Sequence, residues 1–179
     1  MDLLLGILAA VGAMIVLVLI IAAFGKNKFS IEAKITINKP KQEVYNYLKI
    51  LRNTEQYSIW VMADPFMKKD FKGTDGTVGF VYSWESTNQN VGQGEQEIKN
   101  IIDGERVDYE IRFKKPFSGT SFSSISTITA SPEQTTVTWM FNGSKNYFMK
   151  VLYIILNLKK VLKNDMQKSL NNLKNILEK

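Results

Sequence analysis

Two residue types are missing from the 179-residue sequence, which contains neither cysteine nor histidine. The absence of cysteine excludes disulfide bonds, thiolate metal ligands and cysteine nucleophiles. The absence of histidine removes the commonest general base and the commonest metal ligand, and with them every Ser-His-Asp or Cys-His mechanism. Any acid–base chemistry therefore falls to Asp, Glu, Lys or Tyr. No cluster of metal ligands stands out along the chain, so we expect neither a metal ion nor a cofactor.

A long run without charge stands at the N-terminus, from Leu3 to Phe24. As a helix rising 1.5 Å per residue it spans roughly 33 Å, enough to cross a hydrocarbon core of about 30 Å. A cleaved signal peptide is the alternative, but it would carry basic residues ahead of a shorter apolar core, whereas only Asp2 precedes this run. We therefore expect residues 1–25 to form a transmembrane anchor and residues 29–179 to form one folded domain.

The lysines around the anchor predict its orientation. Lys26, Lys28 and Lys34 follow the apolar run, and no Lys or Arg precedes it. Because cytoplasmic flanks carry the excess of positive residues, we expect a single-pass protein with its domain in the cytoplasm.

The basic excess lies at the C-terminus, where residues 145–179 carry eight lysines against Asp165 and Glu178. These lysines could form a solvated helix face. They could also face anionic lipid, where each lysine near the surface adds roughly 1 kcal/mol. Residues 26–144 are close to neutral and contain no nucleic-acid-binding motif, so we expect no nucleic-acid partner.

The rest of the chain changes its hydrophobic period twice. Residues 29–38, "FSIEAKITIN", alternate as a half-buried strand does. Helical spacing follows over residues 39–51, and a second short helix is expected around residues 53–58. Short alternating segments separated by turn signals fill residues 67–142, which predicts an antiparallel meander. From Phe148 to Leu177 the apolar residues return to helical spacing and predict one long amphipathic helix.

The glycines of residues 74–96, "TDGTVGFVYSWESTNQNVGQGEQ", raise the question of phosphate binding. They do not form the Gly-x-x-x-x-Gly-Lys-Ser/Thr pattern of a phosphate loop. Gly92 and Gly94 supply only the first half of a dinucleotide fingerprint, and a strand follows them rather than a helix. We interpret Gly76 as part of a turn, and Gly79, Gly92 and Gly94 as bends or bulges in a curved sheet.

The order of these elements indicates an α+β fold in which a curved antiparallel sheet wraps around the long C-terminal helix. Together with "GTDGTVGFVYSWES", "VGQGEQEI", "RVDYEIRFKKPF" and "TTVTWMF", it resembles the START-like, or SRPBCC, superfamily, and within it the polyketide cyclase/dehydrase-type proteins. The resemblance covers residues 29–178. It implies a helix-grip fold with a cavity between sheet and helix, in which relatives bind lipids, sterols, polyketides or other apolar molecules. Many members of this subgroup have no demonstrated enzymatic activity, so the resemblance argues only weakly for catalysis.

Aromatic side chains on the strands and short helices are candidates for the wall of this cavity, although each could simply fill a core. The candidates are Trp60, Phe66, Tyr82, Trp84, Phe113, Trp139 and Phe141. Four polar side chains are candidates for orienting a ligand: Ser83, Ser124, Ser126 and Asn142.

Three functions remain open at this point. The first is a membrane-anchored START-like protein that binds a hydrophobic small molecule or lipid in the cavity and meets the membrane through Leu3 to Phe24. The second is a cyclase/dehydratase-like enzyme that uses cavity Asp, Glu or Tyr side chains, such as Tyr82 or Glu85, as acid or base. The third is a scaffold whose basic helix contacts a partner protein. The sequence singles out no catalytic residue.

Overall fold

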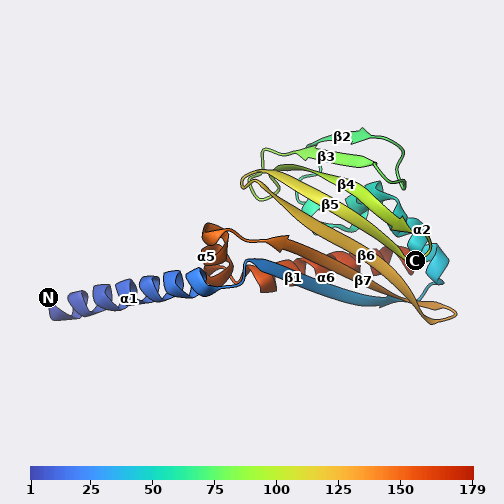
Figure 1. Ribbon diagram of the computed structural model, residues 1–179. Helices are drawn as coiled ribbons and strands as arrows, with labels where there is room; N and C mark the ends of the chain where they lie inside the picture. The colour runs from blue at the N-terminus through green and yellow to red at the C-terminus, as the bar shows by residue number, and fades with distance from the viewer.

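The structure is a computed structural model that describes residues 1–179. An N-terminal helix, α1 (Asp2–Phe24), extends away from a domain made of one sheet and several helices (Figure 1). By length and composition α1 could cross a membrane, and the rest of the protein leaves almost all of it exposed.

Seven strands form a single antiparallel sheet in the order β1-β7-β6-β5-β4-β3-β2. The strands are β1 (Lys28–Ile37), β2 (Lys68–Lys72), β3 (Val81–Glu85), β4 (Gln93–Ile102), β5 (Arg106–Lys115), β6 (Gly119–Ser131) and β7 (Gln134–Ser144). The expected meander is therefore confirmed for β2 to β7, and β1 joins it beside the last strand. Figure 1 shows the sheet curving around the C-terminal helix. This is the predicted helix-grip arrangement.

Short helices connect β1 to β2 and cover part of the concave face. They are α2 (Lys41–Lys49), the 3₁₀ helix η1 (Leu51–Asn53), α3 (Thr54–Tyr57) and α4 (Ile59–Met62). The turn between β2 and β3 is tied to them, because the Asp75 carboxylate accepts hydrogen bonds from the backbone N–H groups of Leu51 and Arg52 at 2.8 and 3.0 Å. Asp75 and Gly76 thus form the expected turn and also hold η1 in place.

The expected single helix over residues 148–177 is wrong in one respect, because the chain forms two helices, α5 (Tyr147–Ile155) and α6 (Leu158–Leu177). Asn157 separates them in a left-handed conformation with φ 46°. Asparagine adopts this conformation more readily than most residues. The apolar spacing continues across the break, so the pattern alone did not reveal it. The side chain of Asn146 caps α5 by accepting a hydrogen bond from Met149 N.

The hydrophobic core lies between the sheet and the C-terminal two-thirds of α6. Met166, Leu170 and Leu173 on this helix are completely buried. The core residues around them are mostly aliphatic and include Ile37, Val44, Leu48, Val107 and Val137. Lys174 Nζ donates to Thr36 O at 2.8 Å, which places the end of α6 beside the end of β1.

Candidate functional site

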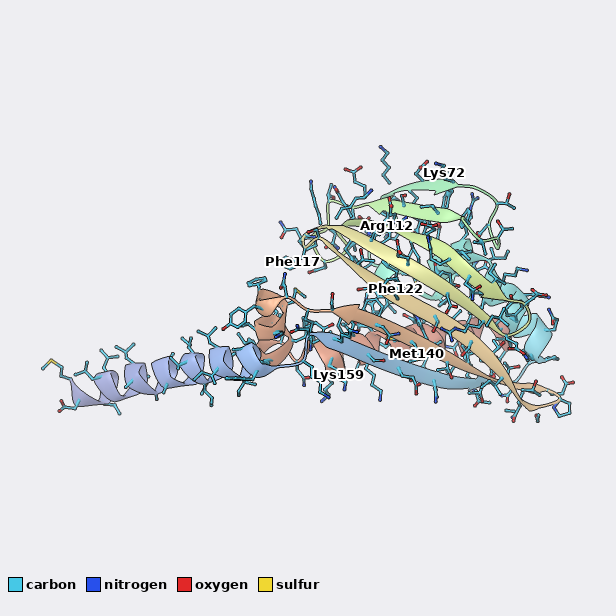
Figure 2. The ribbon with its side chains drawn as sticks, in the orientation of Figure 1. Lys72, Arg112, Phe117, Phe122, Met140 and Lys159 are labelled. Carbon is cyan, nitrogen blue, oxygen red and sulfur yellow. The ribbon has the colours of Figure 1, made fainter.

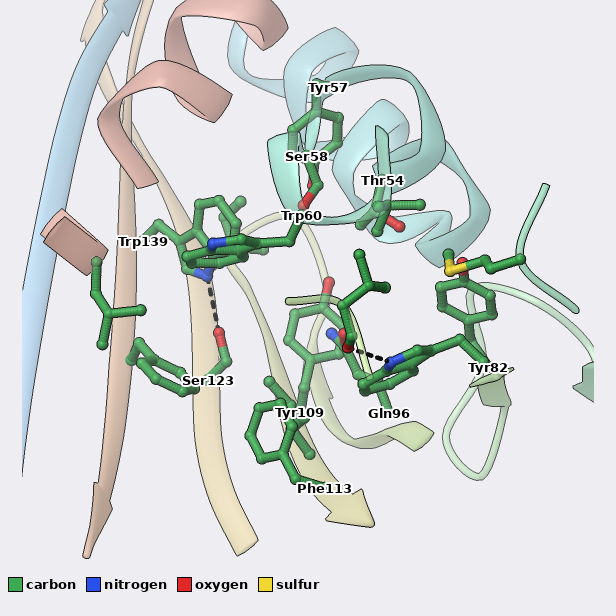
Figure 3. A pocket seen from close by; sticks show the side chains of 18 of the residues that line it. Thr54, Tyr57, Ser58, Trp60, Tyr82, Gln96, Tyr109, Phe113, Ser123 and Trp139 are labelled. Atoms are coloured by element: carbon green, nitrogen blue, oxygen red, sulfur yellow. Dashed lines mark hydrogen bonds between the residues drawn. The ribbon is translucent and has the colours of Figure 1, made fainter. Parts of the chain in front are cut away.

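A pocket of about 260 Å³ lies at the other end of the space between sheet and helices. Its wall combines residues of α3, α4 and the start of α6 with the inner face of strands β3 to β7 (Figure 3). Fourteen of its 19 lining residues are hydrophobic, so the pocket suits an apolar ligand. A second hollow on the outer face, among Lys69, Glu85 and Lys114, has a single hydrophobic lining residue and is a solvated groove.

Aromatic rings make up much of the pocket wall, and they support one another. Trp60 and Trp139 meet edge to face with their centroids 5.6 Å apart, and Trp84 and Phe113 do so at 6.1 Å. Edge-to-face contacts of this kind are favourable for aromatic pairs. Because these rings are rigid and hold one another in place, they cannot collapse to close the space between them.

Two of the indoles are also fixed by hydrogen bonds. Trp139 Nε1 donates to Ser123 Oγ at 2.8 Å, and Ser123 Oγ in turn donates to Met140 O at 3.0 Å. Trp84 Nε1 donates to Val91 O at 3.2 Å. Buried indole N–H groups need such partners. These bonds hold the two rings in the wall, and they leave the ring faces free for apolar contacts.

Two glycines of the glycine-rich segment, Gly92 and Gly94, allow close packing in the pocket wall. A β-carbon at Gly94 would lie 2.6 Å from the Trp84 ring and 2.8 Å from Arg112 O, so the indole can lie across the strand only where no side chain is present. The β4–β5 register shifts between Gln93 and Gly94, which confirms the expected bulge. Gly92 has φ 65°, and a β-carbon there would lie 2.1 Å from Lys115 O. The two glycines permit close packing around the pocket.

Six of the seven predicted wall residues line the pocket, namely Trp60, Tyr82, Trp84, Phe113, Trp139 and Phe141. Phe66 does not, because its side chain is 96% exposed. Asp64 accepts hydrogen bonds from Phe66 N at 3.2 Å and from the Ser86 hydroxyl, and the resulting turn directs Phe66 outward. Met67 lines the pocket in its place. Alternation with Phe80 and Tyr82 predicts that Val78 shares their strand face, but Val78 is exposed and precedes β3.

None of the four polar candidates, Ser83, Ser124, Ser126 and Asn142, lines the pocket. Side chains alternate along a strand, and these four lie on the face opposite to their neighbours Tyr82, Ser123, Ile125 and Phe141. The polar lining residues besides the tyrosines are Thr54, Ser58, Asn90, Gln96 and Ser123. The same alternation could have identified Ser123, because it shares a face with Ile125.

Three tyrosines line the pocket, and no Asp or Glu does. Burial raises the pKa of Tyr57, Tyr82 and Tyr109 above the ordinary value, so at neutral pH they can donate hydrogen bonds but do not act as bases. The Tyr82 hydroxyl is buried without a hydrogen-bond partner in the protein. Glu85, the other acid–base candidate, is exposed at the end of β3 and accepts a hydrogen bond from Gln93 Nε2 at 3.1 Å.

Comparison with known families agrees with this architecture. The profile of the family described as polyketide cyclase/dehydrase and lipid transport matches residues 28–178. The chain belongs to this family. The predicted membership of the START-like superfamily is thereby confirmed. No protein with curated annotation matches the sequence.

Solved structures share the fold at low sequence identity. Protein CV1439 from Chromobacterium violaceum is 14% identical, with a TM-score of 0.57 over 84% of this chain and 97% of that one. Protein jhp0584 from Helicobacter pylori is 9% identical, with a TM-score of 0.63 over 88% and 92%. Norcoclaurine synthase from Thalictrum flavum, solved with dopamine and hydroxybenzaldehyde, is 9% identical, with a TM-score of 0.62 over 83% and 86%. At these identities the likeness concerns the fold alone.

Proposed function

We propose that the protein binds a compact, mostly apolar molecule in this pocket, at the surface of a membrane to which α1 anchors it. The observation that carries the proposal is the space of about 260 Å³ among aromatic rings that hydrogen bonds and edge-to-face contacts hold in the wall. The family description includes lipid transport, and norcoclaurine synthase shows that a related fold can hold small aromatic molecules.

The size of the pocket narrows the class of ligand. Pockets for drug-sized ligands usually measure about 300–1,000 Å³, so this pocket lies just below that range. It suits a ligand of one or two rings, or a single chain, better than a whole two-chain lipid. The ligand would carry a polar group, because Gln96 and Ser58 also line the pocket and require hydrogen-bond partners when a ligand displaces water.

Membrane anchoring rests on α1. After Asp2 this helix carries no charge, and the domain covers only its C-terminal end around Ala22. Hydrocarbon is the solvent that such a surface prefers over water. Lys26, Lys28 and Lys34 on its C-terminal side support a cytoplasmic position of the domain by the positive-inside rule.

A cyclase/dehydratase activity has less support. A general base for such chemistry would have to come from the pocket wall, and the only titratable side chains there are tyrosines with raised pKa values. Tyr82 could still act by donating a hydrogen bond. A buried hydroxyl without a partner costs about 1–3 kcal/mol, and a ligand oxygen within reach would remove that cost.

Native mass spectrometry of the full-length protein, with solvent extraction of whatever co-purifies, tests the proposal. Ile111→Phe places a ring in the pocket, whereas Ile128→Phe makes the same change at a side chain that is 63% exposed and lies outside the pocket. We expect wild type and Ile128→Phe to retain the same small molecule and Ile111→Phe to lose it. A wild-type protein without extractable ligand, or equal retention by both variants, would contradict the proposal.

A further inference from the structure

Four apolar side chains near the junction of α1 and the domain remain half exposed. Phe117 from the β5–β6 loop, Phe148 and Ile155 from α5, and Leu156 after it are 50–62% exposed, and we call them the α5 surface. The rings of Phe117 and Phe148 lie 5.6 Å apart, so the loop and the helix form one continuous patch. Figure 2 shows Phe117 next to α5. No other part of the chain covers this patch, which implies an external partner.

The position of α5 beside α1 indicates that the external partner is a lipid membrane. Tyr147 at its start donates a hydrogen bond from its hydroxyl to Leu19 O of α1 at 3.1 Å. Leu19 precedes the end of α1 by five residues, or about 7.5 Å at 1.5 Å per residue. Interfacial helices bury their apolar face about 5–10 Å into the boundary between headgroups and acyl chains, so this depth matches. Figure 1 shows α5 standing across the end of α1, and a helix in that position lies along the surface of a membrane that α1 spans.

The charge around the α5 surface is positive. Lys145 lies with its ammonium group 4.6 Å from the centre of the Tyr153 ring. Burial, together with the neighbouring charges of Lys150 and Lys159, lowers the pKa of Lys145, so these three cations are gathered near α5. An apolar patch bordered by lysines and a tyrosine is the combination that interfacial helices present to anionic lipid.

We propose that the α5 surface inserts into the headgroup boundary of an anionic phospholipid membrane and forms a second membrane contact beside α1. The proposal rests on the membrane anchoring proposed for α1, but it does not depend on ligand binding in the pocket. It determines which side of the domain faces the membrane.

This contact brings the pocket close to the lipid. Tyr153 of α5 packs on Phe29 with centroids 5.3 Å apart, and Phe29 packs on Phe141 of the pocket wall at 5.5 Å. Leu162, which also lines the pocket, follows α5 by less than two turns of α6. The pocket wall is therefore one aromatic layer away from the inserted helix.

The lack of cysteine makes the test direct, since any introduced cysteine is unique. Phe148→Cys and Ile155→Cys, labelled with an environment-sensitive nitrobenzoxadiazole dye, report on the α5 surface of the full-length protein in nanodiscs of anionic phospholipid. Glu133→Cys in the exposed β6–β7 turn is the matched control. We expect blue-shifted emission and quenching by spin-labelled acyl chains at positions 148 and 155, and aqueous emission quenched by iodide at position 133.

Two further readouts separate the alternatives. Val11→Cys in the middle of α1 reports spanning independently. If mid-chain spin labels quench the dye at position 11 while positions 148 and 155 behave like position 133, α1 spans the membrane but the α5 surface does not contact it. That result overturns the proposal. If Val11 is not quenched, the anchor itself fails and the proposal fails with it. If the blue shift disappears in nanodiscs loaded with a single copy, the α5 surface is an interface between two copies, which also overturns the proposal.

Discussion

The two ends of the space between the sheet and α6 are built differently. At one end Leu170, Leu173 and Met166 are completely buried in a core made mostly of aliphatic side chains. At the other end the same helix contributes Leu162 to a pocket bounded by Trp60, Trp139 and Phe141. We call the end around Leu170 the closed end and the end with the pocket the open end. Branched aliphatic side chains at the closed end interdigitate. At the open end, rigid rings held edge to face leave space between them.

The amphipathic helix α6 therefore stabilises the core with its C-terminal part and borders the pocket with its N-terminal part. The periodic apolar stripe runs through both parts of α6, so the helix itself does not distinguish them. The difference lies in what faces it. Aliphatic partners complete a core, and aromatic partners that are fixed by their own hydrogen bonds leave a cavity.

The largest expected loss of stability comes from shortening a buried side chain at the closed end. Leu170→Ala should reduce the free energy of unfolding by about 2–5 kcal/mol, because it removes a fully buried side chain and leaves a hole. Leu162→Ala, the same change eight residues earlier, should cost less than about 2 kcal/mol because Leu162 already borders open space. Urea denaturation of the detergent-solubilised full-length proteins measures both losses. Equal losses would mean that the two ends are packed alike.

A smaller effect is expected from adding a methyl group beneath Trp84. Gly94→Ala should cost about 1–3 kcal/mol, because the β-carbon would overlap the indole and the Arg112 carbonyl group. It should also shift tryptophan emission as the ring moves. Gly119→Ala is the matched control, because a β-carbon there meets nothing within 4 Å. Thermal unfolding followed by tryptophan fluorescence compares them, and a Gly94→Ala protein with wild-type stability and emission would refute the close packing.

The smallest effect concerns the unpaired hydroxyl in the pocket wall. Tyr82→Phe should leave the stability of the ligand-free protein unchanged or raise it by up to about 1 kcal/mol, because it removes a buried group without a partner. Tyr109→Phe removes a hydroxyl that donates to Leu48 O and should cost about 0.5–1.5 kcal/mol. Calorimetry of the two variants makes the comparison. A clear loss of stability in Tyr82→Phe would show that its hydroxyl is already hydrogen-bonded.

Much of the fold could be predicted because its hydrophobic periods are clear. Alternation predicted β1, short alternating segments between turn signals predicted the meander, and the apolar stripe predicted α6. The aromatic character of the pocket wall followed from the same alternation, which places Trp139 and Phe141 on one face.

The parts that could not be predicted depend on contacts between distant residues. Phe66 points outward because Asp64 bonds to Ser86, 22 residues away. The break at Asn157 is a left-handed residue inside an unbroken apolar period, and no local signal separates it from an ordinary helical asparagine. The location of the pocket at one end of α6 depends on which strands lie opposite each turn of the helix. Which strands face each turn of α6 is determined only once the whole sheet has assembled, so no local segment of the sequence indicates it.

The most direct measurement uses the three tryptophans of the chain, Trp60, Trp84 and Trp139, which all line the pocket. Energy transfer from tryptophan to N-phenyl-1-naphthylamine, an uncharged apolar dye, reports dye bound among them in the full-length protein in nanodiscs. We expect strong, saturable transfer in wild type and in Ile128→Phe, and its loss in Ile111→Phe. Equal transfer in all three proteins would show that the dye reaches the tryptophans from the lipid alone, and would contradict a binding pocket at the open end of the domain.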